Sequence, residues 1–349
     1  MTPLNINPEN YRYHALIGTG GIGSGIFFAL DGDHTLGREE SRSGRFLDQR
    51  DYCKLHIIAH YVKVLLGPSF ETILVSKVGG DGWGRRLLDE MASTGLDTRY
   101  VEVCPGQQTM LSVCILYPDG TGGNLTASDS ACNRVDAEYI SSVEPEFIRL
   151  AGRGVVLAAP EVPLEARLRL LQLGTAHQFL RAASFTSAEM LPAVDMGLLA
   201  RTDLLGINLD EAAALLGRSA EEPPLLAIIE SAVQRLNAIN PLMKIAITAG
   251  KNGSWAWDGD QLTLVPAYPV QVASSAGAGD AFLAALIAGT VAGLTWPQAQ
   301  ELAALTAALS VTSPHTIHPG LERNSLNALA SQSGTSLSDA VKALIKPNL

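Results

Sequence analysis

The late stretch VASSAGAGDAFLAALIAG, residues 272–289, combines small residues, a carboxylate and a long apolar run. Gly277 and Gly279 let the backbone turn its N–H groups toward one point, and the start of the following helix adds partial positive charge there. We therefore interpret Gly277, Ala278 and Gly279 as an anion hole for a transferring phosphoryl group. Asp280, at the same turn, is placed to accept a proton from an attacking hydroxyl. A plain helix cap by Asp280 is the structural alternative.

Asn208 and Glu211 form a second candidate pair, in the stretch TDLLGINLDEAAALLG. They fall where an apolar strand ends and a helix begins. Three residues apart on a helix, the two side chains share one face and can position Mg²⁺-bound water near phosphates. The same pattern also fits an ordinary helix cap.

The stretch AITAGKNGSWAW supplies the third candidate group, Thr248, Gly250 and Gly253, where a strand gives way to a hairpin-like turn. A hydroxyl and a closely approaching backbone at the carboxyl end of a strand suit nucleotide phosphates. We predict that these residues line the nucleotide side of the site.

The early motif GTGGIG, residues 18–23, matches the G-x-G-x-x-G pattern of dinucleotide-binding enzymes. That fingerprint also needs a helix starting at the motif, a second strand, and an acidic residue about 20 residues further on. Only SGIFFAL separates Gly23 from the turn residues 31–33, and a charged stretch follows. A nicotinamide or flavin enzyme is therefore the last of our hypotheses. No Walker A sequence is present either.

The elements that must position these residues alternate between short apolar strands and helices. Strands are expected at 71–79, 109–116, 154–160, 203–208 and 244–250, with helices such as 164–174 and 210–217 between them. Such alternation implies a mainly parallel α/β sheet covered on both faces. The charged stretch 31–54 interrupts this alternation of strands and helices, and we interpret it as a solvated loop or as a flap over an active site. Residues 321–349 are expected to hold one peripheral helix.

Composition limits the class of protein. The 349 residues are 47% hydrophobic and 17% charged, which predicts a large core. The formal net charge of -10 argues against a nucleic-acid-binding surface. Four cysteines without a metal-like spacing predict reduced thiols, and the N-terminus lacks signal-peptide features. The apolar stretch 281–296 is too short to span a bilayer. We therefore expect a cytoplasmic protein without a membrane or nucleic-acid partner.

Taken in order, these segments resemble the ribokinase-like, or PfkB-type, carbohydrate kinase family, over roughly residues 14–320. VSKVGGDGWGRRLLDEMASTGLDTRYV, residues 75–101, is similar to an early strand and helix of that family. Asn208–Glu211 match its N-x-x-E motif, and SVTSPH resembles the segment that closes over the nucleotide base. Gly277–Asp280, G-A-G-D, match its C-terminal signature, which is the most specific element.

The resemblance implies a role for each matching residue. Asp280 would be the base that activates a substrate hydroxyl, with the amides of Gly277, Ala278 and Gly279 as the anion hole. Asn208 and Glu211 would organise Mg²⁺ and its waters, so ATP and Mg²⁺ are the implied cofactors. The nucleotide side would be lined by Thr248, Gly250 and Gly253 together with Asn208.

The resemblance also implies an αβα sandwich with a small β lid. The core would comprise about residues 10–30, 55–105 and 134–320, and the lid about 31–54 and 106–133. Lid strands of this family often pair across dimers, which implies a homodimer.

The sequence departs from the family in two places. The signature normally begins with an Asp that helps to hold a monovalent cation, and this chain has Ser274 there; Pro314, His315 and Thr316 replace a later Gly-Ala. We therefore expect no requirement for potassium.

The second departure concerns the acceptor. Relatives carry a sugar-binding Asp just after the first strand, where this chain has only residues 20–24, including Gly23. Their glycine-rich helix start is replaced by Cys53-Lys54-Leu55-His56. Lys54 and His56 either favour an anionic or polar acceptor or are ordinary surface residues.

These observations predict an ATP-dependent kinase that phosphorylates a hydroxyl of a sugar or sugar-like molecule. A nucleoside kinase of the same family is the nearest alternative. A family-like binding or regulatory protein with weak catalysis is another, and intact Asp280, Asn208 and Glu211 argue against it. The acceptor itself is left open by the sequence.

Overall fold

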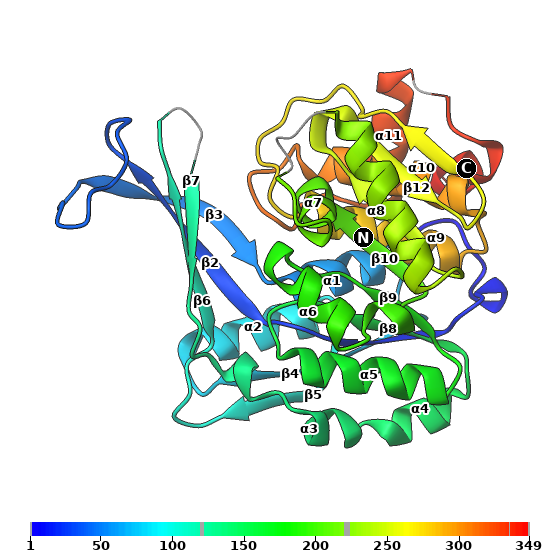
Figure 1. The fold of residues 1–349 in the computed structure, drawn as a ribbon, viewed down its shortest axis with the longest axis horizontal. Helices are drawn as coiled ribbons and strands as arrows, with labels where there is room; N and C mark the ends of the chain where they lie inside the picture. Colours follow the sequence, from blue (N-terminus) through cyan, green and yellow to red (C-terminus); the bar gives the residue numbers. More distant parts are fainter. Residues whose placement is uncertain (1, 119–121, 220–223, 335, 348–349) are drawn as a thin grey trace.

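The computed structural model describes residues 2–118, 122–219, 224–334 and 336–347. Two sheets organise this part of the chain: a large one inside the body of the molecule and a small one that projects from it (Figure 1). The strands of the large sheet are β1 (Ala15–Thr19), β4 (Glu71–Gly79), β5 (Asp97–Cys104), β8 (Gly154–Ala158), β9 (Leu180–Ala183), β10 (Leu204–Asn208), β11 (Lys244–Thr248), β12 (Ser254–Trp257) and β13 (Leu262–Val265).

The large sheet has the order β13-β12-β11-β10-β9-β8-β1-β4-β5. The seven strands from β11 to β5 in this order pair in parallel, and β12 and β13 add an antiparallel edge. All residues of β1 and β8 are buried, because helices cover both faces of a parallel sheet. The expected mainly parallel α/β sheet is confirmed.

Twelve α-helices in the described part of the chain surround this sheet. The first face is covered by α1 (Lys54–Leu66), α2 (Gly82–Ser93), α9 (Ala278–Val291), α10 (Trp296–Ser310), α11 (Arg323–Ser333) and α12 (Asp339–Ile345). The second face is covered by α3 (Ala137–Ser141), α4 (Glu144–Leu150), α5 (Leu164–Ala176), α6 (Met190–Asp195), α7 (Leu209–Leu215) and α8 (Leu225–Ile239). Short 3-10 turns lie at Pro8–Asn10, Ala131–Arg134, Ser187–Glu189, Leu199–Arg201 and Gly250–Asn252.

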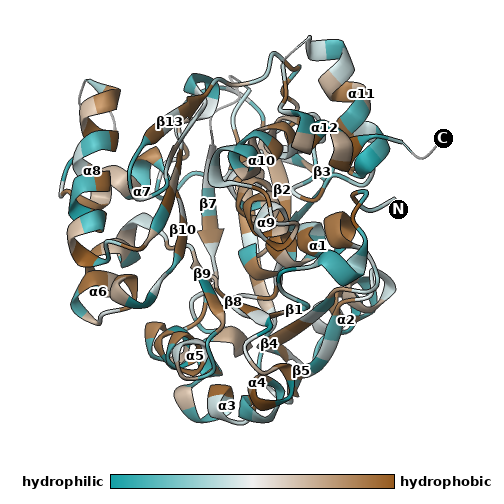
Figure 2. Ribbon diagram, turned by 90° about the vertical axis from the view of Figure 1, so that its right-hand side faces the viewer, coloured by the Kyte–Doolittle hydropathy of each residue, from teal (hydrophilic) through white to brown (hydrophobic). Residues whose placement is uncertain are grey.

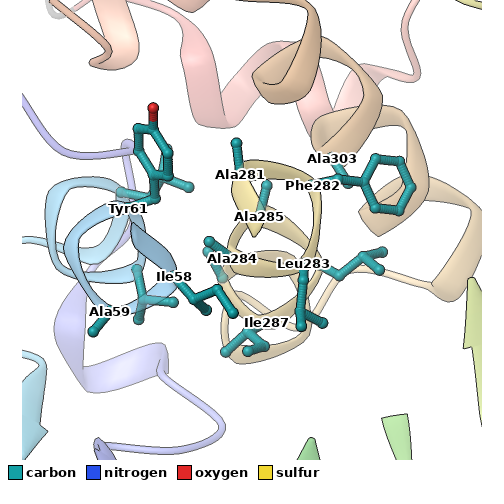
Figure 3. Packing of buried hydrophobic residues seen from close by; sticks show 14 of the residues in the cluster. Ile58, Ala59, Tyr61, Ala281, Phe282, Leu283, Ala284, Ala285, Ile287 and Ala303 are labelled. Carbon is teal, nitrogen blue, oxygen red and sulfur yellow. The ribbon is translucent and has the colours of Figure 1, made fainter. Parts of the chain in front are cut away.

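The apolar sides of these helices turn toward the sheet (Figure 2). Helix α9 is buried almost all round, since it packs between α1 and α10. Small residues allow this close approach: Ala284 of α9 lies beside Ile58 of α1, and Ala281 lies across from Tyr61 (Figure 3). The start of α9, which carries the predicted anion hole, is therefore anchored in the core. None of the helices in the described segments is long and apolar enough to span a membrane.

The small sheet has the order β3-β2-β6-β7, with strands β2 (Gly23–Leu30), β3 (Gly44–Tyr52), β6 (Met110–Leu116) and β7 (Gly122–Thr126). Strand β2 pairs in parallel with β6 and antiparallel with β3. Residues 23–30, which the sequence assigned to the core, thus belong to the small sheet, because β2 continues away from β1 (Figure 1). The charged stretch 31–54 also contains β3, so it is more than a solvated loop.

The GTGGIG motif starts no helix. Three residues separate β1 from β2, and the next α-helix begins only at Lys54. A Cβ on Gly20 would lie 2.7 Å from the Ala159 Cβ, and one on Gly21 would lie 2.5 Å from the Glu161 Cβ. These glycines therefore let the end of β1 pack closely against the segment after β8, and the dinucleotide-binding hypothesis is wrong.

The C-terminal segment differs from the single peripheral helix expected at 321–349. It holds two helices, α11 and α12, whose Leu326, Val341 and Ile345 are buried in the first core face. The Asn5 N–H donates to the Leu344 carbonyl oxygen at 2.8 Å, which ties this segment to the N-terminal part of the chain. The four cysteines are free thiols, as predicted.

Candidate active site

The carboxyl ends of the parallel strands open into a cavity of about 900 Å³. Parallel strands bring their following loops to one edge, so distant motifs meet there. Among the residues that line this cavity are Lys54, Asn208, Glu211, Thr248, Gly250, Gly253, Gly277, Ala278, Gly279 and Asp280. The structure thus brings together all the predicted nucleotide, magnesium and catalytic residues, with Lys54 beside them.

The G-A-G-D turn forms the start of α9. Gly277 is its N-cap, with a φ of 80°, and a Cβ there would lie 2.7 Å from the Thr316 carbonyl oxygen. Gly279 has open space where its Cβ would be. The first N–H groups of a helix have no partner within it, so this turn can present donors to an anion. The Ala278 N–H already donates to the Ser275 carbonyl oxygen at 3.3 Å, which leaves it less free than its neighbours.

Asp280 is buried in the first turn of α9 and forms an ion pair with Lys54, the first residue of α1. The Lys54 Nζ lies 3.9 Å from the Asp280 Oδ1, and the side chains are 29% and 12% exposed. Burial raises the pKa of Asp280, while the Lys54 charge lowers it and Asp51 raises it further. The Asp280 carboxylate raises the pKa of Lys54 in turn. The ion pair therefore favours an ionised Asp280, the form that a general base needs.

Asn208 and Glu211 cap α7 reciprocally. The Glu211 N–H donates to the Asn208 Oδ1 at 2.9 Å, and the Asn208 N–H donates to the Glu211 Oε2 at 2.8 Å. The helix-cap alternative is therefore correct as local structure. Burial raises the pKa of Glu211 to about 6, against the lowering effect of Lys54. A buried carboxylate with this pKa gains from a nearby cation, so the cap does not exclude a role beside Mg²⁺.

Thr248, Gly250 and Gly253 form the turn between β11 and β12. Gly253 has a φ of 95°, and a Cβ there would lie 2.4 Å from the Val265 carbonyl oxygen, so this position requires glycine. The antiparallel pairing of β11 with β12 confirms the expected hairpin. Its backbone forms one wall of the cavity.

Two of the three predicted acceptor residues do not line this cavity. His56 is buried on α1, its ring 4.6 Å from that of Tyr52, and burial lowers its pKa to about 3. It is therefore an uncharged core side chain rather than a surface residue or an anion-binding group. A Cβ on Gly23 would lie 2.5 Å from the Met110 carbonyl oxygen and 2.8 Å from the Cys53 Sγ, so this position has no room for a side chain.

Glu161 is a residue that the sequence reasoning missed. It follows β8 with a φ of 77°, unusual for a side chain other than glycine. Its Oε2 accepts the Lys54 N–H at 3.1 Å, and burial raises its pKa to about 7. Its place directly after a fully buried strand was the available signal. Backbone strain and a buried carboxylate together are typical of functional sites.

The described residues contain no group of three or more His, Cys, Asp and Glu arranged to hold a metal ion. Any divalent ion here would therefore depend on oxygens of a bound ligand together with few protein groups, as is common for Mg²⁺.

An open α/β sheet with a helix N-terminus and a buried, cation-paired carboxylate at one cavity is an arrangement suited to phosphoryl transfer to a small molecule. Residues 58–324 match the family model described as pfkB family carbohydrate kinase. The chain belongs to this family of carbohydrate kinases, as the sequence motifs predicted.

Individual relatives agree with the family. A fructoselysine 6-kinase of Shigella flexneri is 30% identical over 237 residues, which cover 68% of this chain and 81% of that enzyme. The solved ribokinase of Giardia lamblia superimposes with a TM-score of 0.79 at 17% identity, over 91% of this chain and 99% of that one. Arabidopsis thaliana ribokinase, solved with ribose and ATP, gives 0.70 at 20% identity, over 91% and 98%. The ribokinase-like fold is therefore confirmed.

Proposed function

We propose that this carbohydrate kinase transfers the γ-phosphoryl group of ATP to a hydroxyl of a sugar or sugar-like molecule, with Asp280 as general base. The observation that carries the proposal is the meeting of the Asp280 carboxylate, the start of α9 and Lys54 at one cavity. The relatives named above act on fructoselysine or ribose, which supports a sugar as acceptor.

The reaction follows from these groups. The acceptor oxygen forms a bond to the γ-phosphorus while the bond from that phosphorus to the ADP oxygen breaks. Asp280 accepts the hydroxyl proton, and the N–H groups of Gly277 and Gly279 stabilise charge on the transferring group. Lys54 holds Asp280 ionised and adds positive charge beside it. Because α9 is anchored in the core, the donors are in place before reaction.

The cavity also fits the two cofactors. The open space at Gly279 gives a phosphate access to the backbone, and Thr248, Gly250 and Gly253 supply the opposite wall for the nucleotide. Glu211, with Asn208, would hold Mg²⁺ through its waters, and the ion would neutralise phosphate charge when bound. Ser274 cannot supply the carboxylate of a monovalent-cation site, so we propose activity without potassium.

We further propose a cytoplasmic homodimer that pairs through the small sheet. Phe46 and Leu125 on this sheet are 70% and 64% exposed, and Phe28 stacks edge-on against Phe46 at 5.0 Å. Exposed apolar side chains on a sheet are typical of a protein interface. Sedimentation of the wild type and of Phe46→Asp tests the dimer, which the variant should dissociate.

The test of the reaction is acceptor-dependent ADP formation with Mg·ATP and a panel of sugars and nucleosides. Asp280→Asn should lower kcat by about 10²–10⁴-fold while ATP binding, measured by thermal shift, stays within a few-fold of the wild type. Asp339→Asn, an exposed carboxylate on α12, is the matched control. Full activity in Asp280→Asn would exclude Asp280 as the base, and turnover of nucleosides alone would assign the nucleoside-kinase alternative.

A further inference from the structure

Strand β3 carries a carboxylate close to Asp280, at the point where β3 leads into α1. Asp51 is the second-last residue of β3 and lies three residues before Lys54, which pairs with Asp280. Strands β2 and β3 belong to the small sheet and extend outward from the body of the molecule (Figure 1). Asp51 stands at the end of β3 that joins α1, so it lies next to the catalytic groups rather than at the far tip.

Hydrogen bonds fix this end of β3 beside the G-A-G-D turn. The Thr316 N–H donates to the Arg50 carbonyl oxygen at 3.1 Å, and the Tyr52 N–H donates to the Thr316 Oγ1 at 3.1 Å. The Thr316 carbonyl oxygen is also the atom that a Cβ on Gly277 would meet. Thr316 therefore lies between β3 and the start of α9. The Asp51 charge acts on Asp280 across this contact and raises its pKa, in addition to the larger effect of burial.

The neighbouring strand is shaped to admit the Asp51 side chain. Gly25 of β2 pairs with Asp51, and a Cβ on Gly25 would lie 2.3 Å from the Asp51 Oδ2. On the other side of Gly25, Ser112 of β6 lies in register. Asp51, Gly25 and Ser112 thus form a row across one face of the small sheet. Phe28 and Phe46 lie on the opposite face, because side chains alternate along a strand.

The Asp51 carboxylate has no cationic partner within the described segments. None of the ion pairs found there includes Asp51. Its Oδ2 has long contacts with the Ser112 Oγ at 3.5 Å and the Cys114 Sγ at 3.7 Å, and the Tyr52 N–H and the Thr316 side chain also interact with the carboxylate, but together they offset only part of the effect of burial. Burial raises its pKa, so the ionised form is undersatisfied. A ligand that brings hydrogen-bond donors would stabilise the ionised form of this carboxylate.

We propose that Asp51 is an acceptor-binding residue that selects substrates with hydrogen-bond donors, hydroxyl or ammonium, near the transferred hydroxyl. This inference rests on the proposed kinase function and narrows its substrate class. The Asp51 charge acts on Asp280, Glu161 adds a second negative charge once the pH exceeds its pKa of about 7, and Lys54 is already paired with Asp280. An acceptor that carries a phosphate at this end is repelled. The acceptor that suits this arrangement is therefore neutral or cationic, in contrast to the anionic acceptor considered from the sequence.

The test compares Asp51→Asn with Asp48→Asn, an exposed carboxylate on the same strand, in three groups of acceptors. The groups are neutral sugars (D-ribose and D-fructose), amine-bearing sugars (fructoselysine and D-glucosamine) and D-fructose 6-phosphate. Asp51→Asn should raise the KM for the neutral and amine-bearing acceptors at least tenfold, while the KM for ATP changes less than twofold. Asp51→Asn should not raise the KM for D-fructose 6-phosphate. The KM values of Asp48→Asn should match those of the wild type for all acceptors. An equal loss with neutral and amine-bearing sugars assigns hydroxyl recognition, and a larger loss with amine-bearing sugars assigns an ammonium partner.

Binding measured by calorimetry with a non-hydrolysable ATP analogue separates this inference from the kinase function. Tighter binding to the wild type than to Asp51→Asn supports the inference even where no turnover occurs, which would overturn the kinase function alone. Unchanged acceptor KM and affinity in Asp51→Asn, with activity still lost in Asp280→Asn, would overturn the inference alone. If the wild type neither binds nor phosphorylates any of these acceptors, both the kinase function and the inference about Asp51 are contradicted. Gly25→Ala is a second variant: its Cβ displaces the Asp51 carboxylate, so it should reproduce the KM effect without removing the charge.

Discussion

Replacing Lys54 by Met should change the pH dependence of the reaction, because it removes the cation that faces Asp280. At the observed separation of 3.9 Å, two unit charges interact by about 1 kcal/mol in water and about 4 kcal/mol at an effective dielectric constant of 20. The site lies between these limits, since both side chains are largely but not fully buried. A change of 1.36 kcal/mol corresponds to one pKa unit. We expect the acid limb of the pH profile to move upward by about one to two pH units in Lys54→Met.

The direction of this pH shift follows from the protonation state of Asp280, the proposed base. Without the Lys54 charge the protonated form of Asp280 persists to higher pH, so the variant loses most activity at low pH and recovers as the pH rises. The assay is kcat/KM for the acceptor from pH 5 to 9, which reports groups of the free enzyme. Lys54→Arg keeps the charge and should keep the limb near its wild-type position. Lys342→Met, on the surface of α12, controls for the loss of a positive charge elsewhere.

Two further carboxyl groups interact with the Lys54 charge. The Lys54 charge also lowers the pKa of Glu161 and of Glu211. The profile is therefore repeated in Glu161→Gln and Glu211→Gln, and an acid limb that persists in both belongs to Asp280. If Lys54→Met is active and its acid limb coincides with that of the wild type, the ion pair does not set the ionisation of the base and the reasoning fails.

Two other predictions concern the strained and buried residues of the site. Gly277→Ala places a Cβ 2.7 Å from the Thr316 carbonyl oxygen at a positive φ, so it should cost about 1–2 kcal/mol of stability in thermal unfolding. Gly279→Ala places its Cβ in open space, so it should keep the Tm of the wild type but raise the KM for ATP. Equal Tm values for these two variants would contradict the strain argument. Burial raises the pKa of Glu161 to about 7 from the usual 4.5, so the folded state binds this proton more tightly and stability falls as the pH rises through that range. The free energy of unfolding of Glu161→Gln, measured in denaturant, should therefore rise relative to that of the wild type by on the order of 2 kcal/mol from pH 5 to pH 8, and a difference that does not change with pH would refute this.

Much of the local structure could be predicted from short-range patterns. The strand at 71–79, the helix cap at Asn208 and the hairpin after Thr248 follow from runs of apolar residues, a capping side chain and turn glycines. These features depend on neighbours in the chain, so the sequence contains the interactions that form them. The motifs around Asn208 and Asp280 were found for the same reason.

The acceptor end could not be predicted in this way. The sequence placed His56 at a surface or in a pocket, whereas tertiary packing against Tyr52 buries it and holds it uncharged. Glu161 and Asp51 were not predicted as site residues, because neither belongs to a recognisable motif and the only local signal was the position of Glu161 shortly after the buried strand β8. The position of Glu161 depends on the close approach of Gly21, which lies 140 residues away in the sequence. That of Asp51 depends on Gly25, which lies 26 residues away.

By itself, then, the sequence determined the alternating strands and helices, the glycine-rich turn at Gly277–Asp280 and the family of carbohydrate kinases. The tertiary structure decided which charges face one another. The pairing of Lys54 with Asp280 and the place of Asp51 beside them arise where α1, α9 and β3 converge. Electrostatic interactions depend on distance in space and on burial, and neither quantity is fixed by spacing along the chain.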